Sequence, residues 1–130
     1  MVTAVSALTV FAGLPVRDLT AASAWYSQVL GRDPDAHPAP GIAEYYLAAD
    51  HVPEHGTLQL RDDPERAGGG LVTINVEDLS DVVAHLGALS IPFEPRTLPI
   101  DAEAVIAVTV GTFEDPDGNA ITLVQPHPRT

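Results

Sequence analysis

The stretch FAGLPVRDLTAASAWYSQVL, residues 11–30, decides the fold, because a related pattern returns sixty residues later as LVTINVEDLSDVVAHLGALS, residues 71–90. In both copies an alternating apolar run leads into Val-x-Asp-Leu, and a helical pattern follows directly. Asp18 and Asp78 suit the N-cap position, since a short carboxylate accepts hydrogen bonds from the free amides of the first turn and is favoured by the helix dipole. The repeated order of strand, cap and helix predicts one structural unit used twice.

Further strand patterns follow each helix. Apolar spacing predicts helices over residues 19–30 and 79–89, the first ended by Gly31. Alternation predicts strands over residues 6–15, 43–48, 57–61, 71–77, 91–97, 104–113 and 120–125, with at most a short edge strand in the proline-rich residues 32–41. The segment DPDGN, residues 115–119, predicts a hairpin before the last strand, because Pro116 presets a turn and Gly118 can take a positive φ. The order is βαβββ twice, which is an α+β fold.

The length of 130 residues suits one domain in which two half-domains share a sheet. We expect module one over residues 6–61 and module two over residues 71–126. Residues 62–70 between them, DDPERAGGG, have no periodicity and predict a mobile linker.

Composition excludes several classes of chemistry. The chain has no cysteine, which excludes disulfides and thiolate sites, and its six basic residues are all arginine, so no lysine can form a Schiff base. The net charge of −12 argues against nucleic acid and anionic membranes as partners. No apolar run is long enough for a membrane span, and the first ten residues lack the basic segment of a signal peptide. We therefore expect a cytoplasmic protein whose acidic surface either attracts a cationic ligand or only keeps the protein dispersed.

The order of these motifs resembles the vicinal oxygen chelate superfamily, which includes glyoxalase I, ring-cleaving dioxygenases and bleomycin-resistance proteins. The resemblance rests on the two Val-x-Asp-Leu motifs, on Trp25-Tyr26 and Leu30-Gly31 in the first helix, and on the closing segment FEDPDGNAITL, residues 113–123. It covers residues 6–126, of which residues 36–56 match least. It implies that the two modules form a curved mixed sheet around a central cup, with the helices on the outer face.

A period of two residues divides each strand into two faces. In the first strand, Leu8, Val10, Ala12 and Leu14 form an aliphatic face that should pack against a helix, because burying apolar surface stabilises a fold by roughly 25 cal/mol per Å². The mixed faces would then line the cup, as a pocket for a moderately polar organic ligand. The residues predicted to line the cup are Thr9, Phe11, Glu44, Tyr46, Gln59, Arg61, Leu71, Thr73, Asn75, Phe113, Thr122 and Val124.

In metal enzymes of the superfamily, four strands each supply one ligand to a divalent ion. The resemblance places the four positions at Phe11, Gln59, Leu71 and Thr122. Phe11 and Leu71 have no donor atom, and the neutral hydroxyl of Thr122 is a poor replacement for a carboxylate. We therefore expect no metal and no other cofactor at the family position.

Other motifs give little support for catalysis. The segment HVPEH, residues 51–55, has the letter order of an inverted zincin motif, but Pro53 disfavours the helix that would align the two histidines. The chain has no Gly-x-Ser-x-Gly elbow, and the glycine run at 68–70 lacks the lysine of a phosphate loop. We predict no catalytic residue.

Three functions stay open. The first is a metal-free binder, similar to the bleomycin-resistance proteins, that sequesters an antibiotic or another organic ligand of cationic or aromatic character without turnover. The second is a lyase, isomerase or dioxygenase whose metal is held by displaced ligands such as Glu44, His51 or His55. The third is a non-enzymatic interaction or regulatory subunit. The resemblance also implies a homodimer, in which the cup is built either within one chain or across a two-fold axis.

Overall fold

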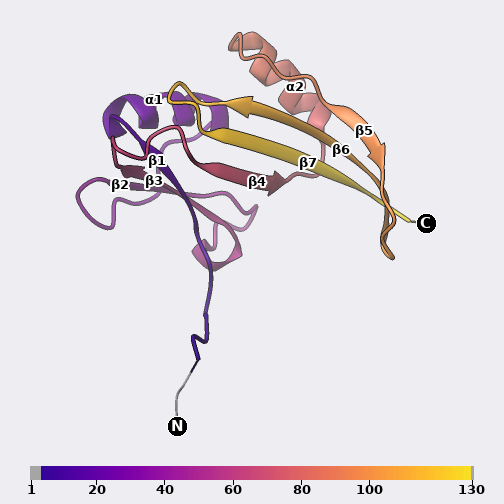
Figure 1. Ribbon diagram of the computed structural model, residues 1–130, viewed down its shortest axis with the longest axis horizontal. Coiled ribbons are helices and arrows are strands. Elements are labelled where there is room, and N and C mark those ends of the chain that lie inside the picture. Colours follow the sequence, from indigo (N-terminus) through magenta and orange to yellow (C-terminus); the bar gives the residue numbers. More distant parts are fainter. Residues whose placement is uncertain (1–3, 130) are drawn as a thin grey trace.

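The computed structural model describes residues 4–129, and in these the chain forms two helices and seven strands in two sheets (Figure 1). The elements in chain order are β1 (Ala12–Val16), α1 (Leu19–Leu30), β2 (Ile42–Tyr46), the 3₁₀ turn η1 (Pro53–His55), β3 (Thr57–Asp62), β4 (Leu71–Asn75), α2 (Leu79–Ala88), β5 (Arg96–Pro99), β6 (Val105–Glu114) and β7 (Ala120–Pro128). The α+β class and the two-module arrangement predicted from the sequence are confirmed.

Module one forms a sheet in the order β1-β3-β2. β1 runs parallel to β3, with Leu14 opposite Leu60, and β2 runs antiparallel to β3, with Tyr45 opposite Leu58. The short edge strand suggested for residues 32–41 is reduced to one isolated bridge between Ala36 and Glu44. Prolines explain this difference, because a residue without an amide hydrogen cannot continue a ladder of hydrogen bonds.

Module two forms a sheet in the order β4-β7-β6-β5. β4 runs parallel to β7, with Thr73 opposite Thr122, whereas β6 is antiparallel to both β5 and β7. The hairpin between β6 and β7 turns at residues 115–119, where Gly118 has a φ of 100°. The predicted hairpin is therefore confirmed.

Both helices begin at the predicted caps. The carboxylate of Asp18 accepts a hydrogen bond from the amide of Ala21, and that of Asp78 accepts from the amide of Ser80. α1 ends at Gly31, which takes the left-handed conformation with a φ of 71°. Figure 1 shows that the two helices lie on the same side of the two sheets.

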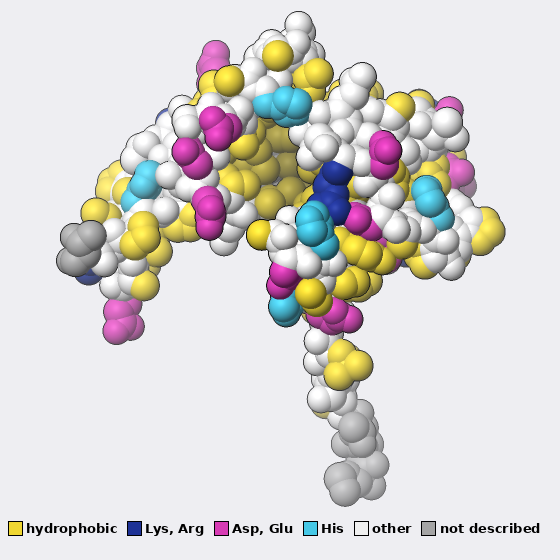
Figure 2. All heavy atoms as spheres, turned by 180° about the vertical axis from the view of Figure 1, so that it is seen from behind, with side chains coloured by type: hydrophobic (Ala, Val, Ile, Leu, Met, Phe, Trp, Pro, Cys, Tyr) yellow, Lys and Arg dark blue, Asp and Glu magenta, His cyan; other side chains and the backbone are white. Residues whose placement is uncertain are grey.

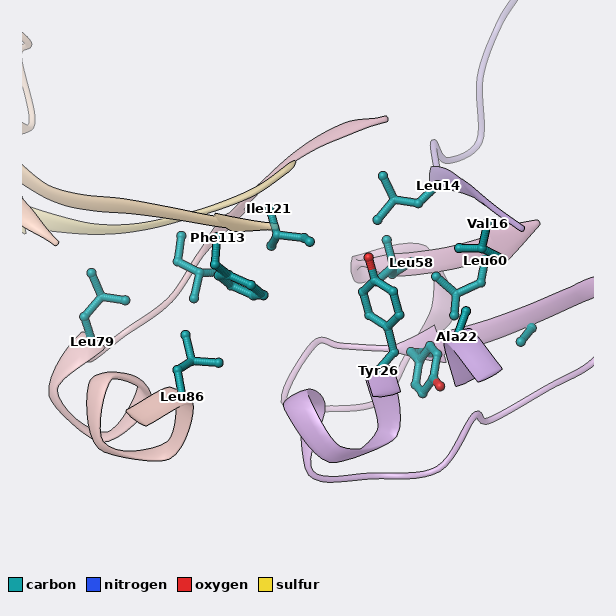
Figure 3. Packing of buried hydrophobic residues seen from close by; sticks show 13 residues of the cluster. Leu14, Val16, Ala22, Tyr26, Leu58, Leu60, Leu79, Leu86, Phe113 and Ile121 are labelled. Carbon is teal, nitrogen blue, oxygen red and sulfur yellow. The ribbon is translucent and has the colours of Figure 1, made fainter. Parts of the chain in front are cut away.

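The hydrophobic core lies between the helices and the sheets. Figure 3 shows its buried side chains in two groups, the first of which comprises Leu79, Leu86, Phe113 and Ile121. The second group, around α1 and the sheet of module one, comprises Leu14, Val16, Ala22, Tyr26, Leu58 and Leu60. The aliphatic faces predicted for β3 and β7 therefore do pack toward the helices.

A buried set of hydrogen bonds joins the two modules. Asp115 accepts from the Tyr26 hydroxyl at 2.7 Å and from Asn119 Nδ2 at 2.8 Å. Asn119 is fully buried; its Nδ2 also donates to the carbonyl of Pro15 at 2.7 Å, and its Oδ1 accepts from the amide of Gly70 at 2.7 Å. We call Tyr26, Asp115 and Asn119 the intermodule latch, because the turn of module two is thereby fixed to β1, α1 and the segment before β4.

The latch also affects the ionisation of Tyr26. Burial raises the pKa of its phenol well above the ordinary value, and the hydrogen bond to Asp115 and the negative charge of that carboxylate raise it further. Tyr26 therefore stays a neutral donor across the physiological pH range.

The segment between the modules is packed against the latch. A Cβ atom on Gly68, whose φ is 91°, would lie 2.3 Å from the carbonyl oxygen of Asp117, and a Cβ on Gly70 would lie 2.7 Å from Leu14 Cδ2. The glycine run thus permits close approach of the backbone. The sequence suggested a mobile linker, whereas two of its glycines are held in tight contact.

The first strand begins later than the sequence predicts. Alternation suggested a strand over residues 6–15, but β1 starts at Ala12, and the preceding described residues extend away from the sheets as an arm (Figure 1). Leu8 and Val10, which were predicted to pack against a helix, are 100% and 81% exposed. That assignment is wrong, because an alternating pattern fits a strand but cannot supply the neighbouring strand that it needs.

The helices of residues 4–129 include none that is long and apolar enough to cross a membrane.

Candidate ligand-binding site

Each sheet has one face that is not covered by a helix. α1 contacts β2 and β3, and α2 contacts β7, so the residues that alternate with the core residues of these strands lie on the opposite face. The helix-free face of module one comprises Glu44, Tyr46, Gln59 and Arg61. The helix-free face of module two comprises Leu71, Thr73, Asn75, Thr122 and Val124. These nine are among the residues predicted to line a cup, and the strand register places them on the two faces.

Polar contacts organise the face of module one. Glu44, only 6% exposed, accepts a hydrogen bond from Gln59 Nε2, and Arg61 Nη1 donates to Gln59 Oε1 at 3.4 Å. Gln59 thus lies between a carboxylate and a guanidinium, with both ends of its amide engaged. The backbone amide of Tyr46 donates to Asp35, which ties the edge of this face to the loop before β2.

The face of module two is more exposed and is lined by hydroxyls. Thr122 shares a hydrogen bond of 2.8 Å with Thr112 on the neighbouring strand β6. Leu71, the first residue of β4, is a large apolar residue and is nevertheless 83% exposed. An exposed leucine beside threonines suits contact with the apolar part of an organic ligand or with another protein chain.

A pocket of about 370 Å³ lies where the two sheets meet. It includes Thr73 and Asn75 of the predicted residues, and adds His55 and Thr57 from the start of β3. The other residues that line it are Val10, Ala12, Leu47, Ala48, Gly56, Leu58, Val72 and Ile74. The sequence partly indicated these two added residues. His55 stood out as a titratable group, and Thr57 lies two positions before Gln59, on the same face of the strand.

His55 is held in place at the edge of this pocket. Its Nδ1 lies 2.6 Å from Asp50, whose other carboxylate oxygen accepts from the amide of Val52. Both hydrogen bonds lower the pKa of Asp50 below its ordinary value, and the bond from Val52 has the larger effect. The side chains of Asp50 and His55 are both more than half exposed, so the pair orients the imidazole rather than forming a buried ion pair.

The predicted position of Phe113 is wrong. Phe113 is 4% exposed and lies opposite Ile121, so it points to the helix side instead of the cup. Its ring packs against Trp25 and Phe93, with centroid distances of 6.2 Å and 5.9 Å. Because β6 is apolar on both faces, the alternation of its residues did not indicate which side chains face the helices. Thr112, opposite Thr122, lies on the helix-free side instead.

Thr9 and Phe11 lie in the arm before β1 rather than in a strand. Both are partly exposed, and Thr9 Oγ1 donates to the carbonyl of Glu54 at 3.1 Å, which attaches the arm to η1.

The donor atoms at the family's four metal positions do not fit a divalent ion. Phe11 and Leu71 offer no donor, Gln59 is engaged with Glu44, and the hydroxyl of Thr122 is bonded to Thr112. The four positions are divided between the two modules, with Phe11 before β1 and Gln59 on β3 of module one, and Leu71 on β4 and Thr122 on β7 of module two. No described pocket is lined by residues of both pairs.

The displaced ligands considered from sequence do not gather either. Glu44 is bonded to Gln59, His51 Nδ1 lies 2.7 Å from Arg32, and His55 is bonded to Asp50. Across residues 4–129 there is no cluster of three or more acidic or histidine side chains that could hold an ion.

Fold and faces together define a two-module α+β protein of the glyoxalase type. A statistical model of the Glyoxalase/Bleomycin resistance protein/Dioxygenase superfamily matches residues 8–123, and the chain belongs to this superfamily. This confirms the resemblance seen in the sequence motifs. Comparison with curated proteins finds no match.

Solved structures agree with this assignment. A glyoxalase/bleomycin resistance protein from Catenulispora acidiphila is 30% identical, with a TM-score of 0.71 over 92% of this chain and 98% of that one. TnmS3, described as an antibiotic binding protein from Streptomyces sp. CB03234, is 25% identical, with a TM-score of 0.66 over 95% of this chain and 98% of that one. An integron cassette protein from V. cholerae shares the fold at 21% identity, with a TM-score of 0.68 over 96% and 98% of the two chains.

Proposed function

We propose that this chain is a cytoplasmic, metal-free binding protein of the glyoxalase/bleomycin-resistance type, which sequesters an antibiotic or another organic ligand without converting it. The observation that carries the proposal is the chemistry at the four metal positions of the family. Phe11 and Leu71 replace two ligands by hydrocarbon, and Gln59 and Thr122 already have hydrogen-bond partners. A site without an ion lacks the Lewis acid that the enzymes of this superfamily use, and no pair of acid and base takes its place on the two helix-free faces.

Two further observations support an antibiotic as the ligand. One structural neighbour, at 25% identity, is described as an antibiotic binding protein. The net charge of −12 concentrates cations near the protein, which favours ligands that carry a positive charge. An aromatic cation would find Tyr46 on the helix-free face of module one, and threonine hydroxyls and the Asn75 amide on that of module two.

The protein acts as a homodimer in this proposal, with a cup built from the module-one face of one chain and the module-two face of its partner. Both faces lie on the side away from the helices, and a second copy covering that side brings them opposite each other. The arm supports a second copy as well, because Val5 and Leu8 are 98% and 100% exposed and gain from burial.

Titration calorimetry of chelator-treated protein with a panel of planar and cationic antibiotics tests the ligand. We expect binding to at least one member, unchanged by added divalent ions. Thr122→Lys, which places a bulky cation on the helix-free face, should weaken a cationic ligand by at least about tenfold. Thr20→Lys makes the same change on the exposed surface of α1 and should leave binding unchanged.

Metal analysis of protein purified without chelator separates the alternatives. A stoichiometric divalent ion, or binding that requires one, would contradict the proposal in favour of a metal enzyme. No binding across the panel would favour an interaction subunit.

Light scattering tests the dimer. We expect a mass of twice the 13.7 kDa of one chain, and a shift toward the monomer for Leu8→Asp, because a charge replaces an apolar contact in the arm. A wild-type monomer at all concentrations would contradict this part.

A further inference from the structure

A second cavity, separate from both helix-free faces, lies on the helix side of the molecule. It has a volume of about 290 Å³ and is lined by residues of both helices and both sheets. Its walls include Val29 of α1, Val82 and Leu86 of α2, and Ile74 of β4. Figure 2 shows a hollow of hydrophobic atoms between the two halves of the molecule, with a basic side chain at its border. We call this space the interhelix cleft.

The cleft exists because the helices meet at one point and not along their length. His85 Nε2 of α2 lies 2.8 Å from the carbonyl oxygen of Gln28 on α1. Leu86 and Tyr26 belong to the two separate groups of core side chains (Figure 3), and both line the cleft. Apolar walls that face each other without touching leave surface that a ligand can cover.

One charged residue, Arg32, lines the cleft. Its Nη2 donates to Asp35 at 2.6 Å, and its Nη1 lies 2.7 Å from His51. Its Nε is buried and has no hydrogen-bond partner among the described residues. A buried donor without an acceptor is unfavourable, so a bound molecule that brings an acceptor to Nε would be stabilised by that hydrogen bond.

The charge at this point is already balanced. Burial tends to raise the pKa of Asp35, but hydrogen bonds from the amide of Tyr46 and from Arg32 lower it below its ordinary value. Asp35 is therefore ionised at neutral pH and neutralises Arg32. An anionic ligand would meet this carboxylate and the net charge of −12, whereas a neutral acceptor would not.

We propose that the interhelix cleft binds a neutral, mainly apolar molecule whose carbonyl oxygen accepts a hydrogen bond from Nε of Arg32. The volume suits a molecule of roughly ten non-hydrogen atoms, if each takes about the share of one water in the liquid. None of the nine residues of the two helix-free faces lines the cleft, and Leu47, Leu58 and Ile74 form the wall that it shares with the 370 Å³ pocket.

The protein carries its own reporter for this site. Trp25 is the only tryptophan of the chain, and its ring centroid lies 6.2 Å from that of Phe113, which lines the cleft. We would titrate the protein with 2-decanone, decane and decanoate, and follow tryptophan fluorescence. The expected result is saturable binding of 2-decanone, with decanoate weaker by at least about tenfold because of its charge.

Two variants test the role of the Arg32 donor and the location. Arg32→Lys keeps the positive charge beside Asp35 but replaces the Nε–H group by a methylene, so it should weaken 2-decanone about tenfold and leave decane unchanged. Val82→Phe fills the cleft from a half-buried position and should weaken both. Thr122→Lys, on the helix-free face of module two, should change neither, so that failure of the cup and failure of the cleft are distinguished.

Methyl NMR spectra keep the test decisive if a variant folds poorly. Shifts of the Val29, Val82 and Leu86 methyls of the wild-type protein on addition of 2-decanone would support the cleft, because these three residues line the cleft and not the 370 Å³ pocket. Shifts confined to Thr73 and Thr122, equal affinity of wild type and Arg32→Lys for 2-decanone, or no binding of any of the three probes would overturn it. Concentration-dependent protection of the cleft methyls without a probe would also overturn it, because a second copy would then cover the space.

Discussion

The two modules contact each other in two regions that differ in packing. At the intermodule latch, Asn119 is fully buried and bonds to both sides of the junction, and Gly70 leaves no space for a Cβ atom. Farther along the same junction, pockets of about 370 Å³ and 290 Å³ separate the sheets on their two sides. The chain therefore fixes its modules at one end and leaves room between them at the other, and the predictions below test that division.

The largest effect is expected at the latch. Asn119→Ala leaves the amide of Gly70 and the carbonyl of Pro15 without their buried partners, and should lower the free energy of unfolding by about 4 kcal/mol. Urea denaturation measures this loss of stability. Asn75→Ala, at an exposed strand position, is the control and should change stability by less than about 0.5 kcal/mol. Similar values for the two variants would show that the latch does not hold the modules together.

Core truncations should cost less beside the cleft than away from it. Leu60 is fully buried in the sheet of module one, and Leu60→Ala should lower the free energy of unfolding by about 4 kcal/mol. Leu86 is also buried but borders existing space, so Leu86→Ala should cost only about 2 kcal/mol. Both follow from the same denaturation experiment. An equal cost would mean that the cleft is closed in solution.

Two glycines give a contrast in backbone packing. A Cβ at Gly70 would lie 2.7 Å from Leu14 Cδ2 and 2.8 Å from Asn119 Oδ1, so Gly70→Ala should destabilise by about 2 kcal/mol. Gly87 in α2 has nothing within 4 Å of such an atom, and Gly87→Ala should stabilise by about 0.5 kcal/mol through helix propensity. Thermal melts measure both changes as shifts of the melting temperature. A neutral Gly70→Ala would show that the segment between the modules is as mobile as its sequence suggested.

The smallest effect concerns the Tyr26 hydroxyl. Tyr26→Phe removes one hydrogen bond to Asp115 while Asn119 keeps its own, so the expected loss is about 1 kcal/mol at pH 7. Because the folded state raises the pKa of Tyr26, its stabilisation is complete below the unfolded value, about pH 10, and is lost as the pH rises further. The difference in stability between wild type and Tyr26→Phe should therefore shrink above pH 10. A difference that grows with pH would contradict the buried, neutral phenol.

Much of the fold could be predicted from short-range patterns. Asp18 and Asp78 cap the two helices as expected, because capping depends only on the first turn that follows. Strand parity was correct for β4 and β7, where hydroxyl and amide side chains alternate with aliphatic ones. Such alternation identifies a face without knowledge of the partner strand.

The features that sequence alone did not predict depend on distant partners. The bond from Asn119 to Pro15 joins residues 104 positions apart, and no local pattern indicates it. The alternating residues before Ala12 look like a strand, but within the described chain they have no sheet to join. Phe113 was assigned to the wrong face because β6 is apolar on both sides. For the site, the alternation of residues along the strands identified those on the helix-free faces. It could not show how the two faces meet.

A mixed dimer tests most directly that the cup is shared between two chains and binds its ligand without a metal. Gln59→Trp would block the module-one face and Thr122→Trp the module-two face, so each variant alone should bind none of the antibiotic found by calorimetry. A purified dimer of one Gln59→Trp chain and one Thr122→Trp chain pairs the two intact faces at one of its two sites. The proposal predicts one ligand bound per mixed dimer in the presence of chelator. No binding to the mixed dimer, while the wild type binds, would contradict it.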